Sequence, residues 1–587
     1  MILADARRIA RHAASGAWAT RTLDDLFRSA VRAHPGREAL VDPPDRAAWL
    51  DGEPRRLDWR SLGDEVARLA GLLRDEGCKR DDVVLVQLPE AVEQVVVHLA
   101  LLRLGCIVSP VPLAWRESEL RPLLATAAAS AAITTSRIGT QATADVWCRL
   151  AREREADGAA DGELDLQVFA FGRDVPVGAL PLDLALDGVD PDDSVEAAPP
   201  GLGADDIATV CWAAGHPLAP KGVPRSHNEW LAGVPSIVAA AGLTSGARIL
   251  SACPLAGAAG WSVGMAAWLS LGGTLVCHQP RDMATWIGQL RAEGVDYALA
   301  PPSILDRMLQ DAHGLDGIDF ARLPRLGSGG AAASAWMVRG WADRGVRIVD
   351  HYASTEGALL TSGRLPATSR ARLVDPETGR TIAEPGRAGE LRVGGPTVCA
   401  GYFRAPALTD GAFDADGLLR TGDLFEAVVD EADEADGEPT LRFVGRLEHV
   451  VVRGGVRLAA EEIEALLLMH PEVAEAAVVG VPDAVLGERI GAAVVPRAGR
   501  APTPEGVLAW LSDTPRAGVE RRAGRSTERS MERSMEQSPE RSSERLPERL
   551  LVLAALPRQA SGRVARRELR ARLAAVPLVR DGERMAA

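Results

Sequence analysis

Three short motifs between residues 420 and 464 decide the fold: RTGDL at 420–424, GRLEH at 445–449 and RGGVRLAAEEIE at 453–464. In the first motif, Asp423 follows a glycine in a predicted tight turn, which would hold its carboxylate at an exposed edge. A carboxylate fixed in this way can accept hydrogen bonds from both hydroxyls of a ribose. The first motif therefore indicates a nucleotide site, although each motif taken alone is more typical of a surface hairpin or a helix cap.

The third motif predicts a turn followed by a helix. Gly454 and Gly455 allow positive φ and a close approach of the backbone. Glu461, Glu462 and Glu464 follow, and acidic residues in the first turn of a helix interact favourably with its dipole. We therefore expect a helix to begin at this acidic segment.

Together and in this order, the three motifs resemble those of the adenylate-forming ligases, a superfamily of acyl- and aryl-CoA synthetases, peptide-synthetase adenylation domains and luciferase. The resemblance covers nearly the whole chain and implies an α/β fold. Residues 1–447 would form a large N-terminal AMP-binding domain with mostly parallel sheets and a β subdomain. Residues 448–587 would form a small mobile C-terminal α/β domain with a low-complexity insertion at 514–546. In the family, the first motif closes the ATP site and the second contains the hinge between the domains.

The size and charge of the chain limit the classes of protein to which it can belong. Its 587 residues are too many for one core, since a domain usually holds about 100–200 residues. It has 66 Lys and Arg against 81 Asp and Glu, a net charge of −15, which argues against nucleic acid and anionic membranes as main partners. We expect no signal peptide and no membrane span, because the N-terminus lacks an apolar segment and no run of about 18 apolar residues occurs.

The seven cysteines contain no CxxC pair and no cluster typical of a metal site. Scattered free cysteines are typical of a reducing compartment, so we expect a cytoplasmic protein.

Hydrophobic periodicity predicts helices alternating with strands. The first part of this pattern is a helix and a strand within 22–42, a helix at 59–76, a strand at 83–89, a helix at 91–104 and a strand at 107–111. Further β segments are expected at 249–253, 274–277, 297–300, 346–349, 386–393, 441–444, 473–479 and 491–495. This spacing is typical of βαβ units and of a mostly parallel sheet.

Residues 526–545 repeat Glu-Arg-Ser with a period near four, and Pro539 would break any long helix there. A docking arm is one interpretation of this segment. A solvated low-complexity insertion is favoured, because the composition cannot bury a core.

Residues 213–222, AAGHPLAPKG, lie where the family has its phosphate loop. Gly215, Lys221 and Gly222 match that loop, whereas Ala, His and Pro replace the Ser and Thr hydroxyls that hold pyrophosphate in the family. A proline also donates no N–H group. We therefore expect weaker triphosphate binding, with His216 as one available donor; the alternative is an ordinary Pro-Lys-Gly turn.

The resemblance assigns the nucleoside to two further places. Gly329, Gly330 and Ala331 would form the adenine-side loop, where a backbone without side chains lets a flat base approach. Asp423 and Arg446 would contact the ribose.

The best-matched catalytic motif is HYASTEG at 351–357. By resemblance, Tyr352 would stack on adenine, Thr355 would contact the α-phosphate, and Glu356 would coordinate Mg²⁺, a cation that prefers oxygen ligands. The alternative is a capped turn after the strand expected at 346–349.

Two departures from the family pattern concern charged residues in the C-terminal part of the chain. The family's final Pro-x-x-x-x-Gly-Lys motif ends here in Arg563, which keeps the charge of the catalytic lysine but changes its shape and reach. Lys221 and Arg563 would thus be the catalytic cations, acting with Thr355 and Glu356. His449 stands at the hinge position, where Asp or Lys is usual; it could respond to pH there, although a solvent-exposed histidine is the simpler interpretation.

Within the superfamily, the chain looks most like the stand-alone 2,3-dihydroxybenzoate and salicylate ligases. The segment PRSHNEW at 224–230 carries this resemblance and assigns His227 and Asn228 to the acid pocket. Those ligases also place His-Asn-Tyr in the pocket, where this chain has Gly257, Ala258 and Ala259. The pocket is therefore expected to be roomier and more apolar, and suited to a bulkier or less polar aromatic acid.

The resemblance implies an ATP- and Mg²⁺-dependent enzyme that activates an aryl or related carboxylic acid as its acyl-adenylate. Transfer to the phosphopantetheine thiol of CoA or of an acyl or aryl carrier protein would follow, in siderophore or other secondary-metabolite biosynthesis. The alternative is a relative impaired in adenylation that binds a ligand or a carrier. The altered phosphate loop and Arg563 favour that alternative, whereas the retained Glu356, Asp423 and Arg446 oppose it.

Overall fold

The chain divides into two compact units, which are described separately. The computed structural model describes residues 1–156, 165–187, 189, 195, 198–216, 219–279, 282–310, 312–428, 439–454, 456–513, 546–559 and 564–578. The first unit comprises residues 1–333, 341–370 and 394–419, and the second comprises 334–340, 371–393 and 420–587. A domain boundary at residue 447 stays a prediction.

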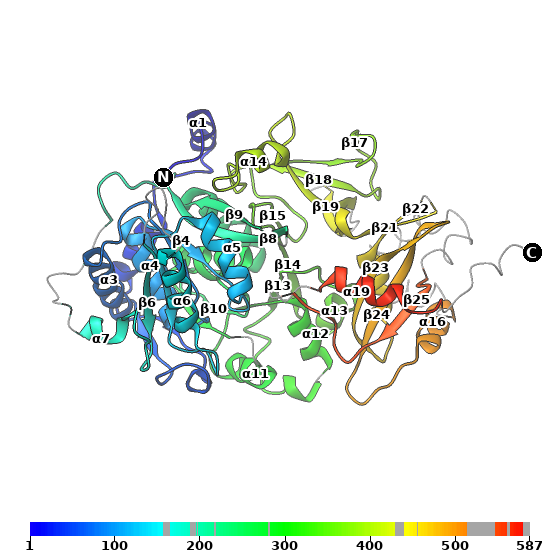
Figure 1. The fold of residues 1–587 in the computed structure, drawn as a ribbon, viewed down its shortest axis with the longest axis horizontal. Helices are drawn as coiled ribbons and strands as arrows, with labels where there is room; N and C mark the ends of the chain where they lie inside the picture. Colours follow the sequence, from blue (N-terminus) through cyan, green and yellow to red (C-terminus); the bar gives the residue numbers. More distant parts are fainter. Residues whose placement is uncertain are drawn as a thin grey trace, which may run out of the picture. The chain divides into compact units, whose positions relative to one another are not determined.

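The first unit contains a seven-stranded sheet with strand order β7-β6-β5-β3-β4-β8-β9. Figure 1 labels four of its strands, β4, β6, β8 and β9. The strands are β3 (Val83–Val86), β4 (Ile107–Pro110), β5 (Ala131–Thr135), β6 (Gln167–Phe171), β7 (Leu180–Pro181), β8 (Ile207–His216) and β9 (Ala219–Ser226). All neighbours pair in parallel except β8 and β9, which form an antiparallel hairpin. The chain passes from β3 to β4 and then crosses to β5 on the other side of β3. In open α/β sheets, such a reversal opens a crevice at the carboxyl ends of the strands.

An eight-stranded sheet in the same unit repeats this order of connections, β15-β14-β13-β12-β10-β11-β1-β2. Its strands are β1 (Glu38–Val41), β2 (Arg56–Asp58), β10 (Arg248–Ser251), β11 (Thr274–Cys277), β12 (Tyr297–Ala300), β13 (Arg325–Gly329), β14 (Arg347–Ala353) and β15 (Leu359–Thr361). The six central strands are parallel, and the two edge strands are antiparallel. Here the order reverses between β10 and β12, so this sheet has a crevice of its own.

Several of the helices in this part of the chain contribute to one large core with these sheets. The helices before residue 420 are α1 (Ala6–Ala14), α2 (Leu23–Ala33), α3 (Trp59–Asp75), α4 (Val92–Leu104), α5 (Glu117–Ala127), α6 (Thr143–Ala156), α7 (Leu182–Asp187), α8 (His227–Leu231), α9 (Val234–Ala241), α10 (Trp268–Leu271), α11 (Met283–Ala292), α12 (Pro302–Gln310), α13 (Ala335–Ala342) and α14 (Pro406–Ala412), with short turns η1 (Arg46–Ala48) and η4 (Ala312–Leu315). Helix α4 is apolar on nearly every face and is buried along almost its whole length, as expected for a helix inside a large core. The ring of Trp59 stacks on that of Trp268 at 5.0 Å, and both belong to this core.

A five-stranded sheet with order β17-β16-β18-β19-β20 follows the eight-stranded sheet in the chain. Its strands are β16 (Arg370–Val374), β17 (Thr381–Ile382), β18 (Gly389–Gly394), β19 (Leu419–Val428) and β20 (Thr440–Arg446). Strands β19 and β20 form an antiparallel hairpin in which Asp423 lies opposite Arg446. The β subdomain expected around 386–393 and 441–444 is therefore confirmed.

The C-terminal part of the second unit is a sheet with order β22-β21-β24-β23, to which β25 adds beside β24. Its elements are η6 (Leu447–His449), β21 (Val450–Arg453), β22 (Val456–Ala459), α15 (Ala460–Leu468), β23 (Val473–Asp483), β24 (Gly487–Pro496), α16 (Pro504–Asp513), β25 (Arg549–Val552) and α19 (Arg566–Ala574). Alternate residues of β23 belong to different clusters: Val478 packs in the cluster of α15, and Ala477 and Val479 pack in the cluster of α19. Because successive strand residues point to opposite faces, the two helices cover opposite faces of this sheet.

The expected fold class, mostly parallel α/β sheets with a large N-terminal domain and a smaller C-terminal one, is confirmed. Strands β11 and β12 match their expected bounds residue for residue, and helix α15 begins at the predicted acidic segment. The predicted insertion at 514–546 lies outside the described residues as far as residue 545. In the described part of the chain, no helix has the length and apolar character needed to cross a bilayer. All seven cysteines are buried as free thiols.

Candidate active site

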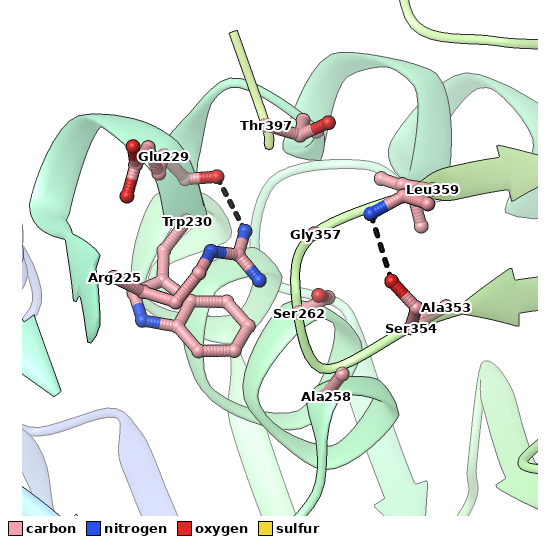
Figure 2. A pocket seen from close by; sticks show the side chains of 12 residues that line it. Arg225, Glu229, Trp230, Ala258, Ser262, Ala353, Ser354, Gly357, Leu359 and Thr397 are labelled. Carbon is pink, nitrogen blue, oxygen red and sulfur yellow. Dashed lines mark hydrogen bonds between the residues drawn. The ribbon is translucent and has the colours of Figure 1, made fainter. Parts of the chain in front are cut away.

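A cavity lies beside the carboxyl end of β14 in the eight-stranded sheet (Figure 2). It holds about 220 Å³ of space not filled by atoms, part of it open to solvent. We call it the Arg225 cavity. Its lining residues are Arg225, Glu229, Trp230, Gly233, Ala258, Ser262, Ala353, Ser354, Gly357, Ala358, Leu359 and Thr397.

One wall of the Arg225 cavity is the tight loop that follows β14. The Ser354 N–H donates to the Ala358 carbonyl at 2.9 Å, and the Ala358 N–H donates to Ser354 Oγ at 3.1 Å. Gly357 has φ +95°, and a Cβ there would stand 1.9 Å from the Thr397 carbonyl oxygen. Only glycine fits this position. The loop therefore fixes Thr355 and Glu356, both half-buried, between two residues that line the cavity.

Glu356 is held by a tyrosine that the sequence analysis missed. The Tyr402 hydroxyl donates to Glu356 Oε1 at 2.8 Å, and the Cys399 N–H donates to the Glu356 carbonyl at 2.8 Å. Lys221 Nζ lies 5.3 Å from the centre of the Tyr402 ring. The structure thus brings Lys221 and Glu356 together around Tyr402. Burial and the nearby Glu356 charge raise the pKa of the Tyr402 phenol well above its ordinary value, so it remains a donor at neutral pH.

The rarity of tyrosine was a signal that could have identified Tyr402. The chain has three tyrosines, Tyr297, Tyr352 and Tyr402. The Tyr297 hydroxyl lies 2.6 Å from Nε2 of His351, the residue before Tyr352 in β14. Burial lowers the pKa of His351 to about 4, so this histidine is neutral at physiological pH. All three tyrosines therefore lie in or beside the HYASTEG segment.

The floor of the cavity carries a buried guanidinium, that of Arg225 at the end of β9. Its Nη2 donates to the Glu229 carbonyl at 2.8 Å, and its Cζ lies 3.9 Å from the centre of the Trp230 ring (Figure 2). The Glu229 carboxylate instead accepts from Arg8 Nη2 at 3.1 Å and from the Ser226 N–H at 2.9 Å. Burial lowers the pKa of Arg225 and raises that of Glu229. Whether the acid pocket is roomier and more apolar than in the hydroxybenzoate ligases stays a prediction.

Aromatic stacking and a π-helical turn form the opposite wall. Trp230 stacks on Trp261 at 5.4 Å, and its Nε1–H donates to Thr209 Oγ1 at 3.0 Å. Trp261 belongs to the π-helical turn η3 (Gly260–Ala267), a kind of turn often found at functional sites. A Cβ on Gly260 would stand 2.2 Å from the Pro254 carbonyl oxygen, so glycine is needed for this close approach.

The residues predicted for the acid pocket separate into two groups. Ala258 lines the cavity, and Gly257 and Ala259 are its half-buried neighbours. His227 and Asn228 do not line it. The Leu23 N–H donates to His227 Nδ1 at 3.2 Å, and the Asn228 amide bonds the Ala19 backbone at 2.9 and 3.0 Å.

The contacts of the first turn of helix α8 account for that separation. Ser226 is the N-cap of the helix and forms a capping box with Glu229. His227 and Asn228 bind the backbone of the N-terminal segment, whereas Trp230 of the same helix lines the cavity.

The predicted adenine-side loop lies at the carboxyl end of β13. Gly329 ends the strand, and a Cβ on it would stand 3.4 Å from the Ala259 side chain. Gly330 has φ +87° with no atom within 4 Å of where its Cβ would be, and Ala331 is exposed. Tyr352 is half-buried in the neighbouring strand β14. This edge therefore has open space over a backbone almost free of side chains.

The ribose residues belong to the second unit, and one expectation about them is wrong. Gly422 does have positive φ, +69°, but β19 continues through it rather than ending in a turn. Asp423 is 6% exposed, not at an exposed edge, and its Oδ1 lies 3.2 Å from Arg446 Nε. The pairing of β19 with β20 explains both facts, since it extends the strand and brings the two side chains together.

Three of the predicted site residues remain: His449, Gly215 and Arg563. His449 is not solvent-exposed: its side chain is 19% exposed and its Nδ1 lies 2.5 Å from Glu461 Oε1. Gly215 belongs to β8, so the predicted phosphate loop is part of a β-hairpin rather than an isolated turn. Arg563 lies outside the described residues.

Two protein-family models match this chain. The family model "AMP-binding enzyme" matches residues 27–403, and "AMP-binding enzyme C-terminal domain" matches residues 462–563. Pyochelin synthase PchD of Pseudomonas aeruginosa is 31% identical over 509 residues, 83% of this chain and 86% of that protein. The 2-hydroxy-7-methoxy-5-methyl-1-naphthoate–CoA ligase of Streptomyces carzinostaticus is 29% identical over 505 residues, 82% of this chain and 85% of that ligase.

Solved structures show the same fold. ATP-bound MatB from Rhodopseudomonas palustris superposes with a TM-score of 0.73 at 22% identity, covering 94% of this chain and 99% of MatB. The anthranilate CoA ligase AuaEII in complex with anthranoyl-AMP gives a TM-score of 0.73 at 18% identity, covering 94% of this chain and 97% of AuaEII.

Proposed function

The chain belongs to the AMP-binding enzyme family, the adenylate-forming ligases that activate carboxylic acids, and we propose that the Arg225 cavity is where it binds its acid. The proposed reaction is ATP-dependent formation of an acyl-adenylate from an aryl or related carboxylic acid, followed by transfer to a phosphopantetheine thiol. The main support for placing the acid in this cavity is that two predicted segments meet there. Ala258, from the acid-pocket segment, and Ser354 and Gly357, from the HYASTEG segment, line a single cavity.

The residues around Glu356 suit the first half-reaction. A carboxylate oxygen of the acid attacks the α-phosphorus of ATP, and the bond from that phosphorus to pyrophosphate breaks. Thr355, half-buried beside the cavity, would donate to the α-phosphate, and the Lys221 ammonium would offset negative charge on the phosphates. Positioning and charge stabilisation of this kind supply most of the catalysis in phosphoryl-type transfers.

Glu356 fits the role of the protein ligand to magnesium. Tyr402 holds one carboxylate oxygen, and the other has no hydrogen-bond partner among the described residues. Within those residues, no group of three His, Cys, Asp or Glu side chains could hold a metal alone. Mg²⁺ is commonly bound by one or two carboxylates together with substrate phosphates, and it neutralises phosphate charge when bound. We therefore propose Glu356 as a ligand to the Mg²⁺ that accompanies ATP.

The remaining predicted residues are proposed to bind the nucleoside and to serve the second half-reaction. Tyr352 would stack on adenine beside Gly329, Gly330 and Ala331, and Asp423 with Arg446 would hold the ribose. The names of two relatives, pyochelin synthase and triostin synthetase I, support an acceptor thiol on a carrier protein in secondary-metabolite assembly. Other relatives named as CoA ligases support CoA. His449 is proposed as the hinge residue.

ATP–pyrophosphate exchange with a panel of carboxylic acids tests the proposed function. We expect exchange that depends on one class of acid and on Mg²⁺. Tyr402→Phe removes the hydrogen bond that orients Glu356, so we expect exchange to fall about 10- to 100-fold and to need more Mg²⁺. Binding of ATP and acid without exchange would instead identify a protein that has lost turnover. Thioester formation with CoA, compared with formation on a phosphopantetheinylated carrier protein, identifies the acceptor.

A further inference from the structure

The cluster of charged groups around Arg225, of which Arg225 and Glu229 line the cavity, contains more positive than negative charge. The charged groups that act on the Arg225 guanidinium are the Glu229 carboxylate and the Arg8 guanidinium. The thiols of Cys399 and Cys211 also lie near, but burial raises their pKa to about 12 and about 11, so both are neutral at pH 7. Two guanidinium groups thus share one carboxylate. Even with Glu229 ionised, this cluster has a net charge of +1.

Most of the hydrogen-bonding capacity of Arg225 is unused. An arginine side chain has five N–H donors, and here one donates to a backbone carbonyl, that of Glu229. In the part of the chain that the structure describes, the buried Nε finds no acceptor. Arg225 is 3% exposed, so bulk water has little access to the remaining donors. A buried charge left in this state is costly unless an anionic partner binds it.

The position of Arg225 links it to the substrate. Its Cζ would stand 3.1 Å from a Cβ on Gly357, two residues after Thr355, and the cavity that it lines includes Ala258 from the acid-pocket segment. We propose that Arg225 is the counter-ion for a second anionic group on the acid, so that the enzyme activates a dicarboxylic acid. This inference rests on the proposed function and specifies its substrate class.

The carboxylate bound by Arg225 is the one that does not react. A buried bidentate pair with a guanidinium occupies both carboxylate oxygens and stabilises their charge in the ground state. The reacting carboxylate needs a free oxygen directed at the α-phosphorus, and ground-state stabilisation of it would raise the barrier. A diacid satisfies both requirements, with one carboxylate on Arg225 and the other free to attack.

The test compares acids that differ by one carboxylate, in ATP–pyrophosphate exchange with the full chain. Suitable pairs are benzoate with its dicarboxylate analogues (phthalate, isophthalate and terephthalate) and pentanoate with glutarate. We expect the diacid of at least one pair to have a kcat/KM at least tenfold above its monoacid. This comparison uses the wild-type protein, so it does not depend on the folding of any variant.

Three variants then locate the source of the preference. Arg225→Met removes the cation while keeping an unbranched side chain, and should lower the ratio of kcat/KM for the diacid to kcat/KM for the monoacid about 10- to 100-fold. Arg225→Lys should retain part of the preference. Arg8→Met is the matched control: Arg8 shares the Glu229 carboxylate but does not line the cavity, so the preference should persist.

Different results would contradict the diacid inference and the proposed function. Wild-type exchange with monoacids at equal or higher kcat/KM keeps the proposed function and overturns the inference. An equal loss for both acids of a pair in Arg225→Met, in a protein that melts like wild type, also overturns it, because Arg225 would then be structural. Exchange with no acid at all overturns the proposed function, and the inference with it.

Discussion

The Arg225 cavity and a second cavity in the same unit each contain a buried arginine, but the two arginines are paired to very different extents. The second cavity, which we call the Arg46 cavity, holds about 370 Å³ and lies at the carboxyl ends of β3, β5 and β6 in the seven-stranded sheet. Arg46 donates to Glu93 at 2.6 and 2.9 Å, to Asp42 at 3.2 Å and to the Asp51 carbonyl at 2.8 Å. Arg225 makes one such bond.

The pKa values of the two guanidinium groups reflect this difference. Burial disfavours the charge at both sites. At Arg46, pairing with Glu93 and Asp42 outweighs burial and raises the pKa, whereas at Arg225 burial prevails and the pKa is lowered. A buried cation surrounded by its own carboxylates belongs to the fold. A buried cation with spare donors in a cavity is suited to a ligand. Variants of the two arginines should therefore differ in what they lose, stability in one case and ligand preference in the other.

The largest effect on stability is expected at the paired arginine. Arg46→Met takes away the buried guanidinium shared by Asp42 and Glu93, leaving Asp42 with two backbone N–H donors and Glu93 with Arg55 at 3.6 Å. Breaking a buried ion pair from one side costs about 3–5 kcal/mol of unfolding free energy. Urea unfolding followed by tryptophan fluorescence would show a lower midpoint. The double variant Arg46→Met with Glu93→Gln should recover part of the loss, because it removes one of the two stranded charges. If Arg46→Met unfolds at the same urea concentration as the wild type, the ion pairs of Arg46 with Asp42 and Glu93 do not stabilise the fold, and the distinction between the two arginines fails.

The next largest effect is on the rate of adenylate formation and concerns Arg563, an arginine proposed to act in catalysis. If Arg563 stabilises the charge that develops at the α-phosphate, Arg563→Ala should lower the rate of acyl-adenylate formation about 10²–10³-fold. The unfolding midpoint should stay at the wild-type value, in contrast to Arg46→Met. Arg563→Lys restores the family's residue and is the matched control. Full activity in the alanine variant would reject the role, and an inactive wild type rescued by lysine would show that the arginine itself impairs the site.

A buried side chain that forms an ion pair can still bind a ligand, and Asp423 is the case that tests this. Asp423 is nearly buried and paired with Arg446, yet it is proposed to accept hydrogen bonds from ribose hydroxyls. Loss of hydrogen bonds to a charged group predicts ATP binding about 10- to 100-fold weaker in Asp423→Ala, measured by calorimetry with Mg²⁺. Glu426→Ala breaks the Glu426–Arg442 pair of the same hairpin and should leave ATP affinity unchanged. Equal weakening by both variants would mean that the hairpin, not the Asp423 carboxylate, supports binding.

Much of the fold could be predicted because its signal is local. Strands β11 and β12 are short apolar runs of the kind that both faces of a buried parallel sheet require, and they begin and end where the sequence indicated. The glycine before Asp423 does have positive φ, as its motif suggested. The motif does not show that β20 pairs alongside and keeps the strand going, since that contact joins residues distant in the sequence.

The site was harder to predict because burial and orientation depend on distant partners. His227 and Asn228 belong to a matching motif, but residues 19 and 23 determine which way their side chains turn. Arg225 stands in the same motif, and its burial depends on residues such as Gly357, far along the chain. Tyr402 lies outside every motif that the resemblance provided. Local patterns therefore identified the loops of the site, whereas the charge inside its cavity required the folded structure.

The smallest effect is expected for the stability of the Arg225 variant, and it completes the comparison with Arg46. Arg225→Met removes a buried, poorly paired cation, and the Glu229 carboxylate that remains keeps Arg8 and the Ser226 N–H as partners. Among the described residues Arg225 donates to a backbone carbonyl and to no carboxylate, so the substitution breaks no direct ion pair and removes a poorly compensated buried charge. We therefore expect the unfolding free energy to change by less than about 1 kcal/mol, against about 3–5 kcal/mol for Arg46→Met.

The two variants are measured in the same urea titration, with a diacid substrate absent and then present. The diacid should stabilise the wild type and not Arg225→Met, because ligand binding to the folded state raises stability only where the site is retained. A loss in Arg225→Met as large as that in Arg46→Met would place Arg225 among the structural arginines and remove the reason for assigning it a ligand.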